Sequence, residues 1–289
     1  MAYNLGGALV YRIIKSFNNN VILCEDMKNT KEYILIGKGI GFNAKADTLF
    51  STVDKIEKLF VIDDDKKSNL KELYDIINPN FIGVATEALS ILTDTIDWDV
   101  NSKSYMALLD HLVFAIERFC DNIILENQFR AELKALYEYE WGLATKVVEF
   151  INTALNLSLN EDEIAFVTMH INGILNKTKA VDSAKQAVII KNLMDFLEKE
   201  LNLHIDKDSL YYNRLIIHLR LAINRVVKGI SENNILIDHI KEKLSKAYGI
   251  SEMVGEFLLK NYNIILTENE LGFIALHIDR LLSQGVTID

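Results

Sequence analysis

The sequence predicts a multi-domain protein, with a small antiparallel β-sheet domain at the N-terminus followed by two homologous all-α helical-bundle domains. Three observations predict this fold class. Short runs of β-branched and aromatic residues, separated by polar turns, lie between Tyr11 and Ile62. After them, apolar residues recur at three- and four-residue spacing, as on one face of a helix. The helical part also contains one segment twice. A single proline and 13 glycines among 289 residues favour long helices as well.

The N-terminal part predicts a small sheet. The stretches YRIIKSFNNNVILCE (11–25) and EYILIGKGIGF (32–42) indicate strands joined by polar turns, and KLFVI (58–62) is expected to close the sheet. Asn18, Asn19 and Asn20 mark a tight turn, since asparagine side chains hydrogen-bond to nearby backbone groups.

The duplicated segment is visible as matching phrases. HLVFAIER (111–118) is repeated as HLRLAINR (218–225), and LNEDEIAFVTMHI (159–171) is repeated as LTENELGFIALHI (266–278). The spacing from His111 to His218 equals the spacing from His170 to His277, because 218 minus 111 and 277 minus 170 are both 107. A repeat without gaps predicts two modules of the same fold.

The modules are expected to be helical. SYMALLDHLVFAIERF (104–119) and KQAVIIKNLMDFLEKEL (185–201) have helical periodicity. Capping boxes are expected at Asn160 with Glu163 and at Thr267 with Glu270, and Pro79 suggests a break between two early helices. Polar stretches at 63–69 and 175–185 suggest linkers. The predicted division is a leader at 1–10, a β domain at 11–66, and helical domains at 67–179 and 180–289.

The composition limits the class of partner. The net charge of −10 argues against a generally basic nucleic-acid binder, but residues 1–60 carry 8 Lys and Arg against 6 Asp and Glu. This mildly basic head suggests an anionic partner for the head alone. Cys24 and Cys120 form no metal or disulfide pattern, which fits a reducing cytosol. No segment has the apolar length of a membrane helix, and the N-terminus lacks the pattern of a secretory signal. We therefore expect a cytoplasmic protein that is not inserted into a membrane.

The stretch GKGIG (37–41) has two interpretations. It matches neither a P-loop nor a dinucleotide-binding fingerprint. In the first interpretation, the glycines serve only a twisted or bulged strand. In the second, they let another backbone approach closely, while Lys38 offers a contact to phosphate.

The histidines are the strongest candidates for chemistry. A single helical histidine is usually a packed or half-exposed residue, and His204 and His239, which have no counterparts, keep that interpretation. The four duplicated histidines allow three chemistries: zinc binding, general acid–base catalysis, and phosphorylation of a ring nitrogen. No zinc motif and no set of catalytic companions is evident, whereas neutral imidazole is a good nucleophile near pH 7.

Arg118 and Arg225 follow His111 and His218 by two helical turns on the same face, where each would steady a phosphoryl group or pair across an interface. Asp110 precedes His111, but Ile217 precedes His218, so the two sites should respond differently.

Together, the β head with NNNV and GKGIGF and the two helical repeats with paired histidines resemble the BglG/SacY/LicT transcriptional antiterminators, from about Tyr11 to about Leu282. The resemblance implies that the head is a co-antiterminator RNA-binding domain, which dimerises and grips a hairpin in the leader transcript. The two repeats would be PTS regulation domains (PRDs). Binding of the dimer would prevent formation of the terminator hairpin.

The resemblance also implies residue roles. The RNA-contacting pattern of the family corresponds to Lys15, Asn20, Gly37, Lys38 and Phe42, and Asn18 and Asn19 belong to the same RNA-binding turn. Lys38 stands where some members have arginine, so its contact is expected with phosphate rather than with a base edge. Phe42 is expected to stack on an unpaired base.

The phosphorylated histidines of the family correspond to His111 and His170 in the first PRD and to His218 and His277 in the second, with Asp110, Arg118 and Arg225 as supporting residues. The implied phosphoryl donors are the sugar-specific transporter for the first PRD, which would oppose the active dimer, and the general carrier protein for the second, which would favour it. We expect a homodimer, with no cofactor, no metal ion and no catalytic residue.

Two other functions remain open. A histidine-dependent, metal-assisted hydrolase would bring histidines and carboxylates together on an ion. A PRD-containing DNA-binding activator is disfavoured, because no helix-turn-helix or ATPase motif precedes the repeats. GKGIGF is most similar to the glucose-operon branch, but β-glucosides and sucrose remain alternatives.

Overall fold

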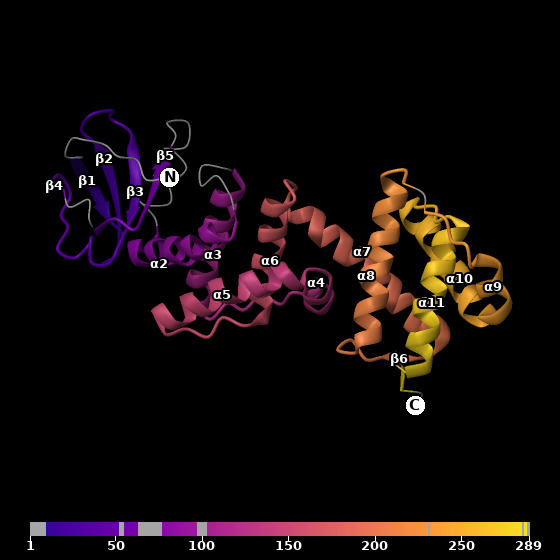
Figure 1. The fold of residues 1–289 in the computed structure, drawn as a ribbon. Helices are drawn as coiled ribbons and strands as arrows, with labels where there is room; N and C mark the ends of the chain where they lie inside the picture. Colours follow the sequence, from indigo (N-terminus) through magenta and orange to yellow (C-terminus); the bar gives the residue numbers. More distant parts are fainter. Residues whose placement is uncertain are drawn as a thin grey trace. The chain divides into compact units, whose positions relative to one another are not determined.

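The computed structural model describes residues 10–51, 55–62, 77–96, 103–230, 232–284 and 286–287 (Figure 1). The predicted leader, apart from Val10, and the predicted linker at 63–69 lie outside these ranges. The chain forms two compact units. The first comprises Met1–Asn127 and Tyr139–Ala180, and the second comprises Gln128–Glu138 and Val181–Asp289. The domain boundaries expected from the sequence stay a prediction.

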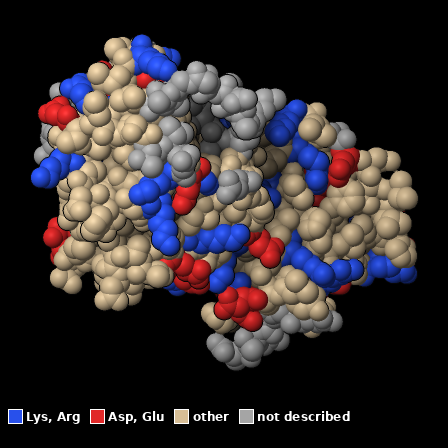
Figure 2. Space-filling model, turned by 60° about the vertical axis from the view of Figure 1, so that its left-hand side comes forward, with Lys and Arg blue, Asp and Glu red and all other residues tan. Residues whose placement is uncertain are grey.

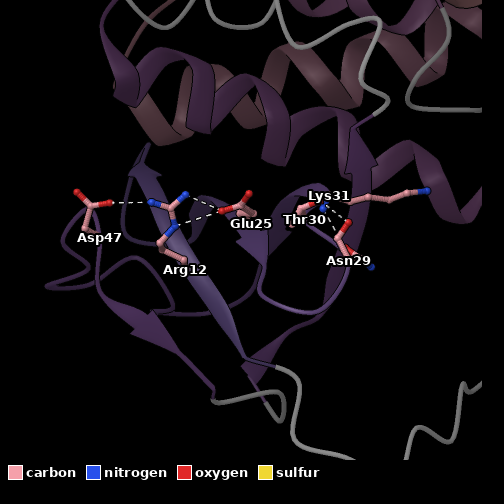
Figure 3. A network of polar contacts seen from close by, with 6 residues as sticks. All are labelled: Arg12, Glu25, Asn29, Thr30, Lys31 and Asp47. Atoms are coloured by element: carbon pink, nitrogen blue, oxygen red, sulfur yellow. Dashed lines mark hydrogen bonds and ion pairs between the residues drawn. The ribbon is translucent and has the colours of Figure 1, made fainter.

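The N-terminal part is a five-stranded antiparallel sheet with the strand order β4-β1-β2-β3-β5. Its strands are β1 (Tyr11–Ser16), β2 (Val21–Asp26), β3 (Glu32–Ile36), β4 (Leu49–Phe50) and β5 (Lys58–Ile62). The KLFVI segment therefore closes the sheet as predicted, by pairing with β3. Arg12 on β1 lies opposite Glu25 on β2, and its guanidinium contacts the Glu25 carboxylate at 2.6 Å and that of Asp47 at 3.3 Å (Figure 3). These ion pairs are exposed, so they contribute little to stability.

The two faces of the sheet bury different apolar side chains because neighbouring residues of a strand point to opposite faces. One face packs Ile13, Ile22 and Leu35 into a small core of its own. The other face, with Val21, Leu23 and Ile34, belongs to a larger core that continues into the helices that follow. The sheet and these helices therefore share one hydrophobic core.

The helices of the first unit follow the sheet. They are α2 (Pro79–Ser90), the short 3₁₀ helix η3 (Ile91–Asp94), α3 (Lys103–Cys120), α5 (Glu138–Leu155) and α6 (Glu161–Leu175). Pro79 stands at the beginning of α2, where its missing N–H costs nothing. The helix expected before Pro79 would lie in residues outside the described ranges. Helix α2 packs against β2 and α3 (Figure 1).

The second unit contains the second copy of the repeat and also α4 (Arg130–Leu136), which belongs to the first copy in sequence. Its other helices are α7 (Ala180–Leu201), α8 (Leu210–Val227), α9 (Ile237–Lys243), α10 (Ser245–Tyr262) and α11 (Glu268–Gln284), with the short strands β6 (His204–Ile205) and β7 (Val286–Thr287). The bounds of α8, α9 and α10 equal those of α3, α4 and α5 moved along the chain by the spacing that separates His111 from His218. The repeat in sequence is thus a repeat in structure, and the predicted fold class is confirmed. The linker expected at 175–185 is shorter than predicted, since α7 already begins at Ala180.

Helix α4 packs against α8 within the second unit. The buried carboxylate of Glu132 accepts a hydrogen bond from the Tyr212 hydroxyl at 3.1 Å, and Arg220 donates to the Leu136 carbonyl at 2.6 Å. This short helix is held by the buried side chains of Leu133 and Leu136 and by polar contacts that its own sequence does not reveal. Within the described ranges, no helix combines the length and the apolar character that crossing a bilayer requires.

Candidate RNA-binding turns and histidine pairs

The residues predicted to contact RNA gather at one end of the sheet. The Asn18–Asn20 turn joins β1 to β2, and residues 37–42 follow β3. The two turns are joined by backbone hydrogen bonds, from Gly37 N to Asn20 O and from Gly41 N to Asn19 O, both 2.9 Å. Separate positions in the sequence thus form one surface.

The glycines allow this close approach. A Cβ atom on Gly41 would lie 2.0 Å from the Asn18 carbonyl oxygen, and one on Gly37 would lie 1.9 Å from that of Lys55. Gly39 has φ of +73°, a conformation that L side chains rarely adopt. Of the two interpretations of GKGIG, the structure supports close backbone approach. Lys38 and Phe42 are exposed, and Phe42 presents 67% of its surface, which is unusual for an aromatic residue.

Charges of both signs are mixed on the visible surface. On the face drawn in Figure 2, Lys and Arg side chains lie among Asp and Glu side chains.

The side-chain amides of two of the three asparagines already have hydrogen-bond partners within the protein. Asn18 Oδ1 accepts hydrogen bonds from the backbone N–H groups of Asn20 and Val21, and Asn20 Oδ1 accepts one from Gly39 N. Their Nδ2 groups donate to the two carboxylate oxygens of Glu87, at 2.6 Å for Asn18 and 3.0 Å for Asn20. Of the three, only Asn19 is exposed.

Sequence reasoning missed Glu87. It lies on α2, 69 residues after Asn18, and a single glutamate in a helix gives no signal of a contact with a distant turn. The helix comes close because α2 has a glycine at its contact with the turn. A Cβ atom on Gly83 would lie 2.6 Å from Asn18 Nδ2.

The first histidine pair lies between α3 and α6. The rings of His111 and His170 are 5.1 Å apart between centroids. Glu163, at the start of α6, connects the pair to Arg118, because Arg118 Nη2 donates to Glu163 Oε1 at 2.9 Å and Glu163 Oε2 lies 3.2 Å from His111 Nε2. The second contact is too oblique for a well-formed hydrogen bond, and both atoms are buried without another partner.

These contacts correct one prediction. Asn160 caps α6, with its Oδ1 accepting from Asp162 N at 3.0 Å, but Glu163 does not complete the capping box. Likewise Thr267 Oγ1 accepts from Glu270 N, while the Glu270 carboxylate turns to Arg225. A buried carboxylate gains more from a charged guanidinium than from a helix N–H that water can reach.

The charges around the first pair follow from burial and proximity. Burial raises the pKa of Glu163, but the nearby His111 and Arg118 outweigh it and keep the pKa below its ordinary value. Burial, reinforced by His111, lowers the pKa of His170 to about 4. Burial also raises the pKa of Asp110, whose Oδ1 is buried without a hydrogen-bond partner.

The second pair lies between α8 and α11 and is closer. The rings of His218 and His277 stack with centroids 3.8 Å apart and planes 20° apart. Arg225 binds Glu270 with two parallel hydrogen bonds, from Nε at 2.7 Å and from Nη2 at 2.6 Å. Burial lowers the pKa of both histidines, that of His277 to about 4, with further lowering by nearby positive groups. The ring of His277 is therefore neutral near pH 7.

Sequence and structure agree on which histidines form pairs. His204 and His239 are both exposed and lie outside the two pairs. Among the described residues, no group of three or more His, Cys, Asp or Glu side chains is placed to hold a metal ion. Chemically, each pair offers two imidazole rings beside an arginine–glutamate ion pair, an arrangement suited to accepting a phosphoryl group.

Comparison with known proteins agrees with these observations. A family model described as the CAT RNA binding domain matches residues 11–69, and a model described as the PRD domain matches residues 86–174 and 191–281. The chain belongs to the CAT–PRD family of antiterminators. As a member of this family, it is an RNA-binding transcriptional antiterminator regulated by the sugar phosphotransferase system.

Several relatives match over nearly the whole chain. Protein GlcT of Staphylococcus saprophyticus subsp. saprophyticus is 32% identical over 275 residues, which cover 93% of this chain and 96% of that protein. The GlcA/glcB genes antiterminator of Staphylococcus carnosus is 31% identical over 278 residues, covering 95% and 97%. A crystal structure of GlcT CAT-PRDI is 30% identical, with a TM-score of 0.47, and covers 57% of this chain and 98% of that chain.

Proposed function

We propose that this antiterminator binds a hairpin in a leader transcript as a homodimer, and that phosphorylation of its four paired histidines controls this binding. The observation that carries the proposal is the recurrence of one arrangement in both PRDs: two histidine rings in contact, with an arginine bound to a buried glutamate beside them. A purely structural role would not require the same set of two histidines, one arginine and one glutamate twice.

The RNA surface consists of the two turns at the end of the sheet. Lys38 and Lys15 bind phosphate, Phe42 stacks on an unpaired base, and Asn19 offers an exposed amide. Gly37 contributes by its lack of a side chain, which keeps the turns together. Asn18 and Asn20 contact RNA only after their amides exchange Glu87 for a nucleotide.

Dimerisation explains how so small a surface binds one hairpin. Two linked sheets engage the hairpin together, and the gain in avidity depends on a geometry that lets both bind. Phosphoryl groups add charge at the PRDs and so change which geometry is stable. Phosphate on His111 and His170, from the sugar-specific transporter, opposes the binding geometry. Phosphate on His218 and His277, from the general carrier protein, favours it.

The histidines act as phosphoryl acceptors, so we assign no catalytic residue, and neither a cofactor nor a metal ion is needed. Because the target is a nascent transcript, the protein acts in the cytoplasm. The names of its relatives, including the GlcA/glcB genes antiterminator, favour a glucose-responsive operon.

A binding experiment with the full chain tests the proposal. Labelled leader hairpins from glucose, β-glucoside and sucrose operons are titrated with the protein before and after phosphorylation by purified carrier protein and transporter. We expect preference for the glucose-operon hairpin, and weaker binding after transfer from the transporter. Equal binding to all hairpins and to an unrelated RNA would contradict the RNA assignment. Unchanged binding after verified phosphorylation would contradict the control by phosphate.

A further inference from the structure

The two PRDs have a buried glutamate at equivalent positions, but its contacts differ between them. In the first, Glu163 is shared, with one oxygen on Arg118 and the other 3.2 Å from His111 Nε2. In the second, Arg225 takes both oxygens of Glu270. The carboxylate is therefore directed at the histidine ring only in the first PRD.

The nitrogen that faces Glu163 is closed to an incoming group. His111 Nε2 and Glu163 Oε2 each have less than 1 Å² of accessible surface, although 17% of the His111 side chain is exposed. The exposed part of the side chain therefore lies away from Nε2, and Nδ1 is the only other ring nitrogen.

The negative charge of the Glu163 carboxylate determines which tautomer the His111 ring adopts. At the observed separation of Nε2 from the carboxylate oxygen, an Nε2 lone pair would be repelled, whereas an Nε2–H is attracted. A carboxylate beside one ring nitrogen thus holds the proton there and leaves the lone pair on the other. The pKa of Glu163 lies below its ordinary value, in keeping with a charged carboxylate.

We propose that Glu163 is a positioning residue that directs phosphorylation of His111 to Nδ1. The inference rests on the proposed function, in which His111 accepts a phosphoryl group, and goes beyond it by naming the atom and the residue that selects it. For His218, Glu270 has no such influence, because both of its oxygens are bound to Arg225.

The transfer step balances without a further reactant. The Nδ1 electron pair forms a bond to phosphorus while the phosphorus–nitrogen bond of the donor breaks, and that electron pair returns to the donor nitrogen. The proton on Nε2 stays on the ring, facing Glu163. A phosphoryl group on Nε2 would instead place its charge against the Glu163 carboxylate in a position without room for it.

The test uses potassium phosphoramidate as a small phosphoryl donor, so that it does not depend on any carrier protein. Full-length wild type, E163Q and E270Q are treated and digested at alkaline pH. The peptide that contains His111 is isolated, and the phosphorylated nitrogen is assigned from ¹H–³¹P correlation spectra. Thermal unfolding of each variant verifies that it is folded.

We expect Nδ1-phosphohistidine at His111 in the wild type and in E270Q. In E163Q, the amide accepts from a protonated Nε2 or donates to an unprotonated one, so neither tautomer is enforced, and a large share of the Nε2 isomer appears. Loss of a merely structural contact would change the amount of product but not the isomer.

Three results overturn the inference: the Nε2 isomer in the wild type, the same Nδ1 isomer in folded E163Q, or no product at His111. A parallel reaction with phosphorylated carrier protein and transporter separates this inference from the proposed function. Phosphoramidate labelling at Nδ1 without transfer from either protein would leave the role of Glu163 intact and refute the phosphotransferase assignment.

Discussion

The side-chain amide of Asn18 donates a 2.6 Å hydrogen bond to Glu87, so an acidic residue of α2 already binds an amide that we propose contacts RNA. The same carboxylate also binds Asn20. RNA phosphates and Glu87 are both anionic, and both cannot lie against this turn without repulsion. We therefore expect the contact to oppose RNA binding.

Replacing Glu87 with alanine should strengthen binding of the leader hairpin. The variant frees both amides and removes a negative charge, and we expect the dissociation constant to fall about fivefold, which corresponds to roughly 1 kcal/mol. Fluorescence anisotropy with a labelled hairpin measures it. E149A is the matched control, because Glu149 is an exposed glutamate on α5, and it should bind as the wild type does. Weaker binding by E87A would show instead that Glu87 holds the turn ready for RNA.

The glycine that joins the two turns should not tolerate a side chain. In G41A the new Cβ would lie 2.0 Å from the Asn18 carbonyl oxygen, so the turns must separate. We expect the free energy of unfolding to fall by about 1–3 kcal/mol and hairpin binding to weaken at least about tenfold. Urea titration and anisotropy measure the two effects. G142A is the control, since nothing lies within 4 Å of its Cβ on α5, and its stability should rise slightly. Wild-type binding by G41A would refute the joined-turn surface.

Stability should decrease in mild acid because of two partly buried histidines. The pKa values of His170 and His277 are lowered by burial, and then by nearby positive charge, from 6.5 to about 4. Between these values the unfolded chain binds protons that the folded protein does not. The contribution is thus fully present above pH 6.5 and is lost as the pH falls towards 4, at no more than about 1.4 kcal/mol per pH unit for each ring.

Urea unfolding at pH 7.5, 6 and 5 measures the slope of the free energy of unfolding against pH. H277Q should give a shallower slope than the wild type, since one proton-binding difference is removed. H204Q is the control, because the His204 side chain is 74% exposed, and it should leave the slope unchanged. A wild-type slope in H277Q would mean that other groups cause the acid sensitivity.

An aspartate in place of His111 should imitate part of the charge of a phosphoryl group. It would stand near Glu163, and the repulsion between the two carboxylates should disturb the contact between α3 and α6. We expect H111D to lower readthrough severalfold in a terminator–reporter fusion. H204D adds the same charge outside the pairs and should read through as the wild type does. Unchanged or increased readthrough in H111D would refute the inhibitory role assigned to the first PRD.

The sequence by itself determined the fold class, the duplication and the membership of each histidine pair. These features depend on local periodicity and on a repeat without gaps, and matching patterns fold into matching helices, as the bounds of α3 and α8 show. The turn at Asn18–Asn20 and the role of the glycines in residues 37–41 could also be predicted from the sequence, because backbone conformation there depends on the residues themselves.

Only the tertiary structure decided which partners the charged side chains have. Local rules predicted that Glu163 and Glu270 would cap their own helices. Folding instead brings the partly buried Arg118 and Arg225 next to these buried carboxylates, and a charged hydrogen bond prevails. The contact of Glu87 with Asn18 and the difference between Glu163 and Glu270 arise in the same way. Such contacts join residues 45 to 69 positions apart, and their geometry is set by the packing of whole helices rather than by any local pattern.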